Sequence, residues 1–446
     1  MTESTTGRTV GLRGASASRG PRRAVNTVVL LVVLLAAAGC QEHRRPAATA
    51  SGPLIAYTLP KSTPWFRPGD VSFVVTKGQA AIKTWTKQVD SSRFGGFSRP
   101  VFTADGQFAV ARYSDEQVGR YPYDGGDIRA ELAWVDVATS EIHEVSIDAR
   151  SRTGSQPPSR PGNPYALQGS TVVWQAPTPA NAPDGQVVLM QLDLSQPNPQ
   201  PTILRTVQLP PRTPGQQAVP YRTQGFTGDV IGAGHGRVAV AKKYDTDPET
   251  QADRLFLVDA DGTVRDLSHE PTSQWVTATF SADGTRLAYE TGKYAKAGTC
   301  GEHQVSVFDT ATGRPAADFP PGPFDATPKP YFYGNVDAAV WWTSDGKLRA
   351  AAGADKCPGN PSEITPYDGV WELRGSQWTQ VDPAETYRDF PFPNGAVLVK
   401  AKTAASGDKQ QSAQTSNGTG LFIRTGAQLI HVADVEAADV AVAPAQ

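Results

Sequence analysis

The amino-acid sequence predicts an all-β fold, a β-propeller with seven four-stranded blades. Two observations predict it: a short turn motif recurs at near-regular spacing, and the strand-like runs at the two ends of the chain add up to one further blade. About 395 residues follow the N-terminal segment, whereas one domain usually has roughly 100–200 residues. A chain of this length is expected to form either several domains or one repetitive architecture, so repeats are sought first.

The recurring motif consists of an aromatic residue, two small or hydroxyl residues and Asp-Gly. It occurs as FTADG at 102–106, FSADG at 280–284 and WTSDG at 342–346, each time between two short apolar runs. Asp-Gly favours a tight turn in which glycine adopts a positive φ, and an alternating strand then returns. The motif therefore predicts a hairpin whose turn contains Asp105, Asp283 or Asp345, and these aspartates are expected to be structural.

The spacing of the motif predicts further, degenerate copies. The interval from Asp105 to Asp283 is nearly three times as long as the interval from Asp283 to Asp345, so two units are missing from the first interval. Hairpin-like sequences fill it at 167–174 and 233–240, and a sixth copy lies at 393–399. Second hairpins follow in five units, at 134–145, 255–267, 305–313, 371–376 and 422–432. Four short strands per unit are typical of a propeller blade.

The seventh blade is predicted from the two ends of the chain. Three strand-like runs precede the first unit, Leu54–Thr58, Val71–Val75 and Ala80–Trp85, and one run, Asp439–Val442, follows the sixth. Pairing the C-terminal strand with the N-terminal strands would complete four strands and close the ring without open edges between blades.

The F-[ST]-x-D-G motif followed by an alternating strand resembles the repeat of TolB-type propellers, which are relatives of the WD-repeat propellers. The resemblance spans roughly residues 53–444 and is good in three units. It implies the propeller fold and a turn role for Asp-Gly. TolB itself carries a separate N-terminal α/β domain, whereas here a short tether leads directly into the first strand, so the partners of TolB are not carried over.

Residues 1–39 are predicted to be an export signal. A leader with five arginines and one acid precedes an uninterrupted apolar run, Val28–Ala38. This run is too short for a bilayer-spanning helix, which needs about 20 residues, and matches the apolar part of a signal peptide, which has about 7–15. LAAAGC at 35–40 resembles the lipobox of bacterial lipoproteins, which implies lipidation of Cys40 and cleavage before it, although Ala37 stands where the family usually has leucine. An ordinary secretory peptide and a short membrane anchor are the alternatives. Arg22-Arg23 leaves the export route open between the Sec and twin-arginine routes.

The mature chain is predicted to have two parts, the lipidated cysteine with its tether at 40–52 and the propeller domain at 53–446. Cleavage removes five arginines and one glutamate, which changes the formal net charge from −2 to −6. The chain has no Lys/Arg block, so no nucleic-acid partner is expected. The expected location is the outer face of the cell membrane, with a lipid anchor and a protein or envelope polymer as partner.

Extra sequence length is concentrated between the second and third strands of the units. The predicted inserts are Ser114–Ala130, Gln175–Gln186, Lys243–Asp253, Thr291–His303, Ala351–Asp368 and Ala401–Gly420. Inserts at one loop position gather on one face of a repeat protein, and that face is often the binding face. The candidate binding residues are Tyr121, Tyr123, Asp124, Tyr294, Tyr367 and Asp368. Two inserts share Pro-Tyr-Asp-Gly, at 122–125 and 366–369, which a simple turn preference also explains.

Cys300 and Cys357 lie in two of these inserts, in neighbouring units. Loops at equivalent positions of adjacent blades emerge on the same face, and export places the chain in an oxidising compartment, so a disulfide between them is predicted. Two free thiols, or a metal pair with His303, are the alternatives. The acidic stretch 245–253 lacks the glycine of a calcium loop and is expected to be solvated.

Catalytic motifs are absent from the sequence: there is no G-x-S-x-G, H-E-x-x-H or phosphate-binding glycine loop. No catalytic residue, resident metal or cofactor is therefore expected. The leading hypothesis is a binding or scaffolding module. The alternative is a hydrolase or lyase acting on envelope glycans or peptides, which predicts a central funnel lined by carboxylates and arginines. A third hypothesis is an accessory subunit of a neighbouring membrane protein.

Overall fold

The computed structural model describes a series of strands and many of the short turns between them. The described residues are 52–59, 69–78, 80–89, 93–117, 127–151, 165–176, 185–210, 228–242, 254–267, 274–293, 302–316, 339–343, 345–352, 369–374, 377–382, 390–391, 397–402, 419–425, 428–433 and 440–443. They contain twenty-nine β-strands and belong to the second of two compact units, 50–446. Every regular element among them is a strand, which confirms the all-β prediction. The described part contains no helix of the length and apolarity needed to cross a membrane.

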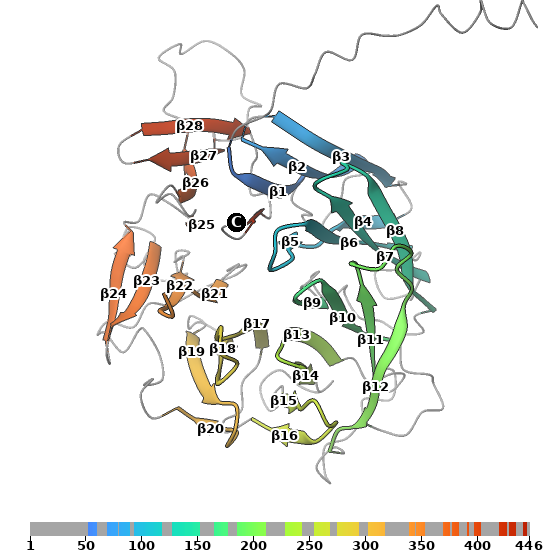
Figure 1. Ribbon diagram of the computed structural model, residues 1–446, viewed down its shortest axis with the longest axis vertical. Helices are drawn as coiled ribbons and strands as arrows, with labels where there is room; N and C mark the ends of the chain where they lie inside the picture. The colour runs from blue at the N-terminus through green and yellow to red at the C-terminus, as the bar shows by residue number, and fades with distance from the viewer. Residues whose placement is uncertain are drawn as a thin grey trace, which may run out of the picture. The chain divides into compact units, whose positions relative to one another are not determined.

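The strands form seven antiparallel sheets, six of them with four strands (Figure 1). In spatial order the sheets are β29 (Val440–Val442), β1 (Leu54–Leu59), β2 (Gly69–Lys77) and β3 (Ala80–Val89); β4 (Arg93–Phe97) with β5 (Val101–Phe102), β6 (Phe108–Gln117), β7 (Asp127–Asp136) and β8 (Ile142–Ser151); β9 (Tyr165–Gln168), β10 (Thr171–Gln175), β11 (Gln186–Asp193) and β12 (Thr202–Gln208); β13 (Gly228–Gly234), β14 (Arg237–Lys242), β15 (Arg254–Val258) and β16 (Val264–Asp266); β17 (Gln274–Phe280), β18 (Arg286–Lys293), β19 (Glu302–Asp309) and β20 (Arg314–Pro315); β21 (Ala339–Trp342), β22 (Leu348–Ala352), β23 (Gly369–Arg374) and β24 (Gln377–Asp382); β25 (Phe390–Pro391), β26 (Val397–Lys402), β27 (Thr419–Thr425) and β28 (Gln428–Ala433).

The C-terminal strand belongs to the N-terminal sheet, as predicted. β29 pairs antiparallel with β1, with Val440 opposite Tyr57 and Val442 opposite Ile55. Such pairing of the two ends of the chain ties the first and last segments into one sheet.

The sheet of β4–β8 corrects the prediction of four strands per unit, because it contains five. β4 and β5 both pair with β6, so together they form one interrupted innermost strand. The interruption ends at Pro100, which has no backbone N–H to donate to a ladder. Ser98 bridges the gap: its N–H donates to the Arg112 carbonyl at 2.7 Å, and its hydroxyl accepts the Arg112 N–H at 3.1 Å.

The hairpin of β11 and β12 was not among the predicted second hairpins; its connection, 194–201, has eight residues and contains no glycine. Asp193 supplies the turn instead. Its carboxylate accepts the Ser195 N–H at 3.0 Å, the Ser195 hydroxyl at 2.6 Å and the Gln196 amide at 2.8 Å. An aspartate side chain that binds the backbone two residues ahead builds a turn without glycine.

Neighbouring sheets pack face to face through shared apolar clusters. One cluster joins Val173 and Leu189 to Val240 and Phe256, and thus unites the sheets of β9–β12 and β13–β16. Similar clusters join β29–β3 to β4–β8, β4–β8 to β9–β12, β13–β16 to β17–β20, and β17–β20 to β21–β24. Sheets that stack radially on successive neighbours make the β-propeller fold.

Alternation of strand direction separates two faces of the fold. Strands are counted here from the innermost strand of each sheet outward. On one face, which we call the turn face, connections join the first strand to the second and the third to the fourth; these connections are two to eight residues long. The opposite face, here the loop face, receives the connections from second to third strands, which are eight to sixteen residues long. The predicted position of the inserts is therefore confirmed, but several bounds were wrong. β6 runs to Gln117 and β7 starts at Asp127, so the first insert shrinks to 118–126.

Candidate functional site

The innermost strands line the centre of the fold with few charged residues. In β29, β4, β5, β9, β13, β17, β21 and β25 the charged residues are Arg93 and Asp229. Each lies within two residues of the start of its strand, at the loop face. The hydrolase hypothesis predicted carboxylates and arginines converging on the centre, and the described innermost strands do not supply such a set. The described residues also contain no group of three or more His, Cys, Asp or Glu side chains suited to a metal.

The Asp-Gly turns are closed by their own side chains. In the turn at 281–285 the Ser281 hydroxyl donates to Asp283 at 2.6 Å and accepts the Arg286 N–H at 3.0 Å, while the Thr285 N–H donates to Asp283 at 3.0 Å. Thr103 with Asp105, and Thr343 with Asp345, repeat the hydroxyl–carboxylate bond at 2.6 and 2.5 Å. The prediction that these aspartates serve the turns is confirmed by this geometry.

Hydrogen bonds also lower the pKa values of the aspartates in these turns. The Ser281 hydroxyl is the largest cause that lowers the pKa of Asp283 to about 2, and the Lys347 ammonium is the largest cause that lowers the pKa of Asp345 to about 2. A general acid or base works best when its pKa lies near the operating pH. Carboxylates that stay ionised down to about pH 2 are therefore suited to structure and not to proton transfer.

The low pKa of Asp283 predicts a specific acid sensitivity. Its ordinary pKa is 3.8 and its folded-state pKa is about 2, so the ionised carboxylate stabilises the folded state above about pH 4, and this contribution is lost as the pH falls toward 2. Asp283→Asn is expected to be less stable than the wild type at pH 6, and the gap should narrow as the pH falls from 4 to 2. Urea unfolding midpoints at several pH values measure it. A gap that stays constant over this window would contradict the assignment.

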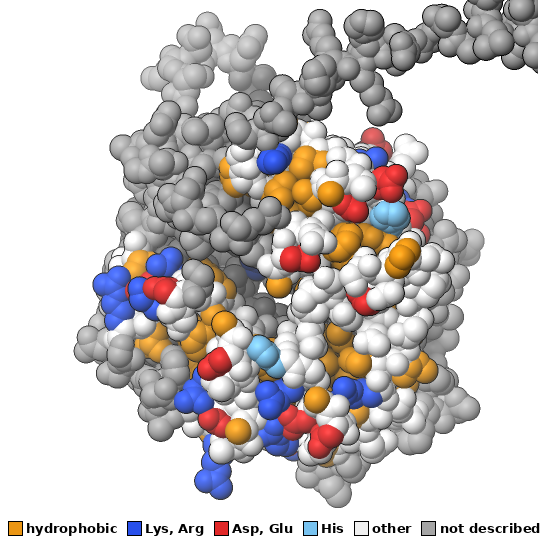
Figure 2. All heavy atoms as spheres, viewed as in Figure 1, with side chains coloured by type: hydrophobic (Ala, Val, Ile, Leu, Met, Phe, Trp, Pro, Cys, Tyr) orange, Lys and Arg blue, Asp and Glu red, His pale blue; other side chains and the backbone are white. Residues whose placement is uncertain are grey.

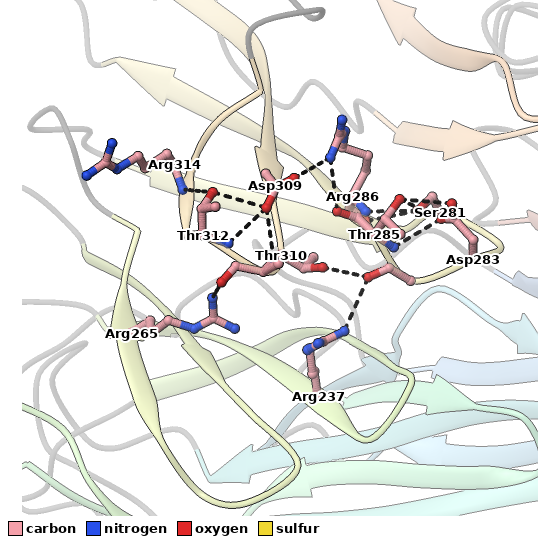
Figure 3. A network of polar contacts seen from close by, with 12 residues as sticks. Arg237, Arg265, Ser281, Asp283, Thr285, Arg286, Asp309, Thr310, Thr312 and Arg314 are labelled. Atoms are coloured by element: carbon pink, nitrogen blue, oxygen red, sulfur yellow. Dashed lines mark hydrogen bonds and ion pairs between the residues drawn. The ribbon is translucent and has the colours of Figure 1, made fainter.

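Arginines link three neighbouring sheets on the turn face, and Figure 3 shows the contacts between two of them, β13–β16 and β17–β20. Asp259, in the β15–β16 turn, accepts Arg237 Nε at 2.9 Å and Arg265 Nη2 at 2.7 Å. Arg205 of β12, in the preceding sheet, donates to the Asp259 carbonyl. Arg237 and Arg265 also donate to carbonyls of the following sheet, those of Gly284 at 3.3 Å and Ala311 at 2.8 Å. The guanidinium groups therefore hold turns of different sheets together.

The same network continues within the sheet of β17–β20. Thr310 Oγ1 donates to the Gly284 carbonyl at 2.7 Å, and Arg286 Nη1 donates to Asp309 at 2.5 Å. Figure 2 shows positive and negative side chains next to one another in the lower half of the view, without a field of one sign. Paired charges of this kind organise the turn face, and its described residues form no single-sign patch that would attract a polyelectrolyte.

Gly284 offers a test of this contact between sheets, with Gly346 as a matched control. Both glycines have positive φ, +71° and +78°, but a Cβ on Gly284 would lie 2.5 Å from the His235 ring of the neighbouring sheet, whereas a Cβ on Gly346 would meet nothing within 4 Å. Both alanine variants should lose about 1–2 kcal/mol from the left-handed backbone, and Gly284→Ala should lose more. Thermal unfolding measures the difference in stability between the two alanine variants. This difference should disappear when both substitutions are made in a His235→Gly protein. Equal losses in the two alanine variants would show that the ring does not press on this turn.

The arginine network was not predicted from the sequence. Arg205, Arg237 and Arg265 lie far apart along the chain and belong to no motif. A weak signal exists in hindsight, because Asp259 and Asp261 precede Gly262 in a predicted turn. Nothing local indicates which arginines reach that turn.

All candidate binding residues lie outside the described residues. Tyr121, Tyr123 and Asp124 fall in the connection 118–126, Tyr294 in 294–301, and Tyr367 and Asp368 in 353–368. The strand ends that carry these three connections lie on the loop face. Two of the connections belong to adjacent sheets, which are joined by a hydrogen bond from Trp342 Nε1 to the Thr279 carbonyl at 3.3 Å. The third belongs to the sheet of β4–β8, which is not adjacent to them.

The three cysteines also lie outside the described residues. Cys300 falls in the connection 294–301 and Cys357 in 353–368, on the same face of neighbouring sheets, and the disulfide between them stays a prediction. Cys40 precedes the first described residue.

One hairpin reaches further at the loop face than β10 of the adjacent sheet. β6 and β7 have ten residues each, whereas β10 has five and β14 has six. At about 3.3 Å per residue, β6 extends roughly 15 Å further than β10. The Tyr165 hydroxyl of the adjacent sheet donates to the Val110 carbonyl at 3.1 Å, and β6 continues for seven residues beyond Val110. The hairpin therefore carries the connection 118–126 beyond the adjacent sheet.

The fold places the chain in the class of β-propeller proteins. No family model and no curated protein matches it. Solved structures similar to it include TolB from Acinetobacter baumannii, at 15% identity over 67% of this chain and 61% of that chain, with a TM-score of 0.32. They also include an acylaminoacyl peptidase from Pyrococcus horikoshii, at 11% identity over 87% and 52%, with a TM-score of 0.43, and an oligogalacturonate lyase from Vibrio parahaemolyticus, at 13% identity over 79% and 95%, with a TM-score of 0.36. The chain thus spans about three fifths of the TolB structure.

Proposed function

We propose that the protein is a membrane-anchored binding or scaffolding lipoprotein of the outer face of the cell membrane. Lipid on Cys40 is the anchor, each of the seven sheets is one blade of a closed ring, and the loop face binds a protein or an envelope polymer. The observation that carries the proposal is the asymmetry of the connections within the sheets. Those from second to third strands, on the loop face, have eight to sixteen residues, while those on the turn face have two to eight. In repeat folds, long connections gathered on one face are typical of a binding surface.

Two further observations support binding over catalysis. The described innermost strands bring only Arg93 and Asp229 as charged residues, and the Asp-Gly carboxylates are held ionised by their own turns. A hydrolase or lyase built on this ring would have to draw most of its charged catalytic groups from outside the described innermost strands.

Affinity capture tests the proposal. The mature chain with Cys40→Ser is immobilised and exposed to solubilised envelope. One variant has the connections 118–126 and 353–368 shortened, and a matched control has the turn-face connection 194–201 shortened instead. We expect a specific component to bind the wild type and the control but not the loop-face variant. Equal capture by all three chains, or capture by none, would remove the main support for a binding module. Turnover of envelope glycans or peptides by the purified chain would favour the enzyme alternative.

A disulfide between Cys300 and Cys357 is part of the proposal, because it would join two neighbouring loop-face connections. We expect the intact mass of the exported chain to rise by two hydrogens on reduction. Cys300→Ser should abolish this shift and leave Cys357 open to alkylation without reductant. Alkylation of both cysteines in the unreduced wild type would show free thiols, and their protection by bound zinc would favour the metal pair.

A further inference from the structure

The chain enters the propeller on the turn face. β1 is the second strand of its sheet, with β29 on one side and β2 on the other. First strands run from the loop face to the turn face, so β1, which is antiparallel to β29, starts at the turn face. Leu54, the first residue of β1, therefore lies on the face opposite to the long connections.

Backbone hydrogen bonds hold this point of entrance in place. The Gly78 N–H, in the turn between β2 and β3, donates to the Pro53 carbonyl at 2.8 Å. On the other side the Ala443 N–H, just after β29, donates to the Leu54 carbonyl at 3.1 Å. The start of β1 is thus fixed from both neighbouring strands, and the preceding chain leaves from the turn face.

The length of chain before this point limits what can face the membrane. Eleven residues separate Cys40 from Gly52. Fully extended they reach about 40 Å, and as a flexible coil they span on average only about 20 Å. β2, which pairs with β1 in the same sheet, has nine residues and rises about 30 Å between the two faces. Bringing the loop face to the bilayer would therefore use most of the extended tether, at a large loss of chain entropy.

We infer that the turn face lies against the membrane and that the loop face points away from it. This inference rests on the proposed lipid anchor and identifies the kind of partner: a macromolecule beyond the membrane surface, such as a soluble or wall-bound component, and not the lipid headgroups. The turn face suits a position next to the membrane, where it binds no macromolecular partner. Its connections are short, and its charges are paired, as in Arg286 with Asp309 and Lys347 with Asp345.

Energy transfer to the membrane surface tests the orientation. The full lipidated chain, with Cys300→Ser and Cys357→Ser, is reconstituted in phosphatidylcholine vesicles that carry an acceptor on the headgroups. A donor is attached to one new cysteine at a time. Lys77→Cys and Asp70→Cys mark the two ends of the same strand, β2, at the turn and loop faces, and Ala311→Cys marks the turn face of a distant sheet. All three positions are exposed.

We expect transfer from the Lys77 and Ala311 positions to exceed transfer from the Asp70 position. If the chain binds the vesicles and transfer from the Asp70 position equals or exceeds transfer from the other two, the inferred orientation is wrong. The proposed lipid anchor would still hold in that case. High transfer from Lys77 with low transfer from Ala311 would show a molecule lying on its side and would also overturn the inferred orientation. If the purified wild-type chain does not bind the vesicles, the anchor of the proposed function fails, and the orientation fails with it.

Discussion

Replacing Cys40 with serine is expected to transfer the mature protein from the membrane fraction to the soluble fraction. The serine hydroxyl cannot form the thioether that holds the diacylglycerol. Each buried methylene of an acyl chain contributes about 0.8 kcal/mol to membrane binding, and stable anchoring needs two such chains. The loss should therefore be close to complete, and fractionation of cells that express the two chains measures it.

Cys300→Ser is the matched control for this substitution, since it also removes one thiol but should leave the protein in the membrane fraction. Mass spectrometry of the wild-type N-terminus should find a lipidated cysteine as the first residue. Two results would contradict the anchor. A soluble wild-type protein would indicate an ordinary secretory peptide, and a Cys40→Ser chain that stays in the membrane would indicate that the apolar run Val28–Ala38 itself holds the protein.

Phe256→Ala is expected to lower the free energy of unfolding by about 3–5 kcal/mol, the usual loss for a large buried aromatic side chain. Phe256 is fully buried and packs in the cluster that joins its sheet to that of β9–β12. Its removal leaves a cavity at the boundary of two sheets, where both must move to fill the space. The loss is large compared with the total stability of about 5–15 kcal/mol that is usual for a folded protein.

Ile203→Ala provides the comparison, because Ile203 is 63% exposed on the outermost strand of the neighbouring sheet. This variant should change the stability by no more than about 0.5 kcal/mol. Urea unfolding of both variants measures the two effects. Similar small losses in both would mean that the sheets of β9–β12 and β13–β16 do not share a packed core.

Local patterns carried most of the information about the fold. The motif around Asp105, Asp283 and Asp345 predicted the first hairpins because a turn with positive φ at glycine depends on a few adjacent residues. The hairpin at 194–201 was missed; its connection has eight residues, and Asp193 makes the turn through side-chain hydrogen bonds. β4 was missed because its sequence, RFGGF, has two glycines and no alternating apolar pattern. It is a strand because β6 is long enough to pair with it beyond Pro100.

By itself, the sequence determined the all-β class, the order of the hairpins, the pairing of the C-terminal strand with the N-terminal sheet and the position of the long connections. Each of these follows from alternation and turn chemistry over a few residues, or from counting strands. The tertiary structure alone decided that Arg205, Arg237 and Arg265 meet at Asp259, that the His235 ring lies against Gly284, and that the chain enters on the turn face. These features depend on strand direction and on contacts between sheets. Residues far apart in the sequence meet there, and no local pattern encodes which of them come together.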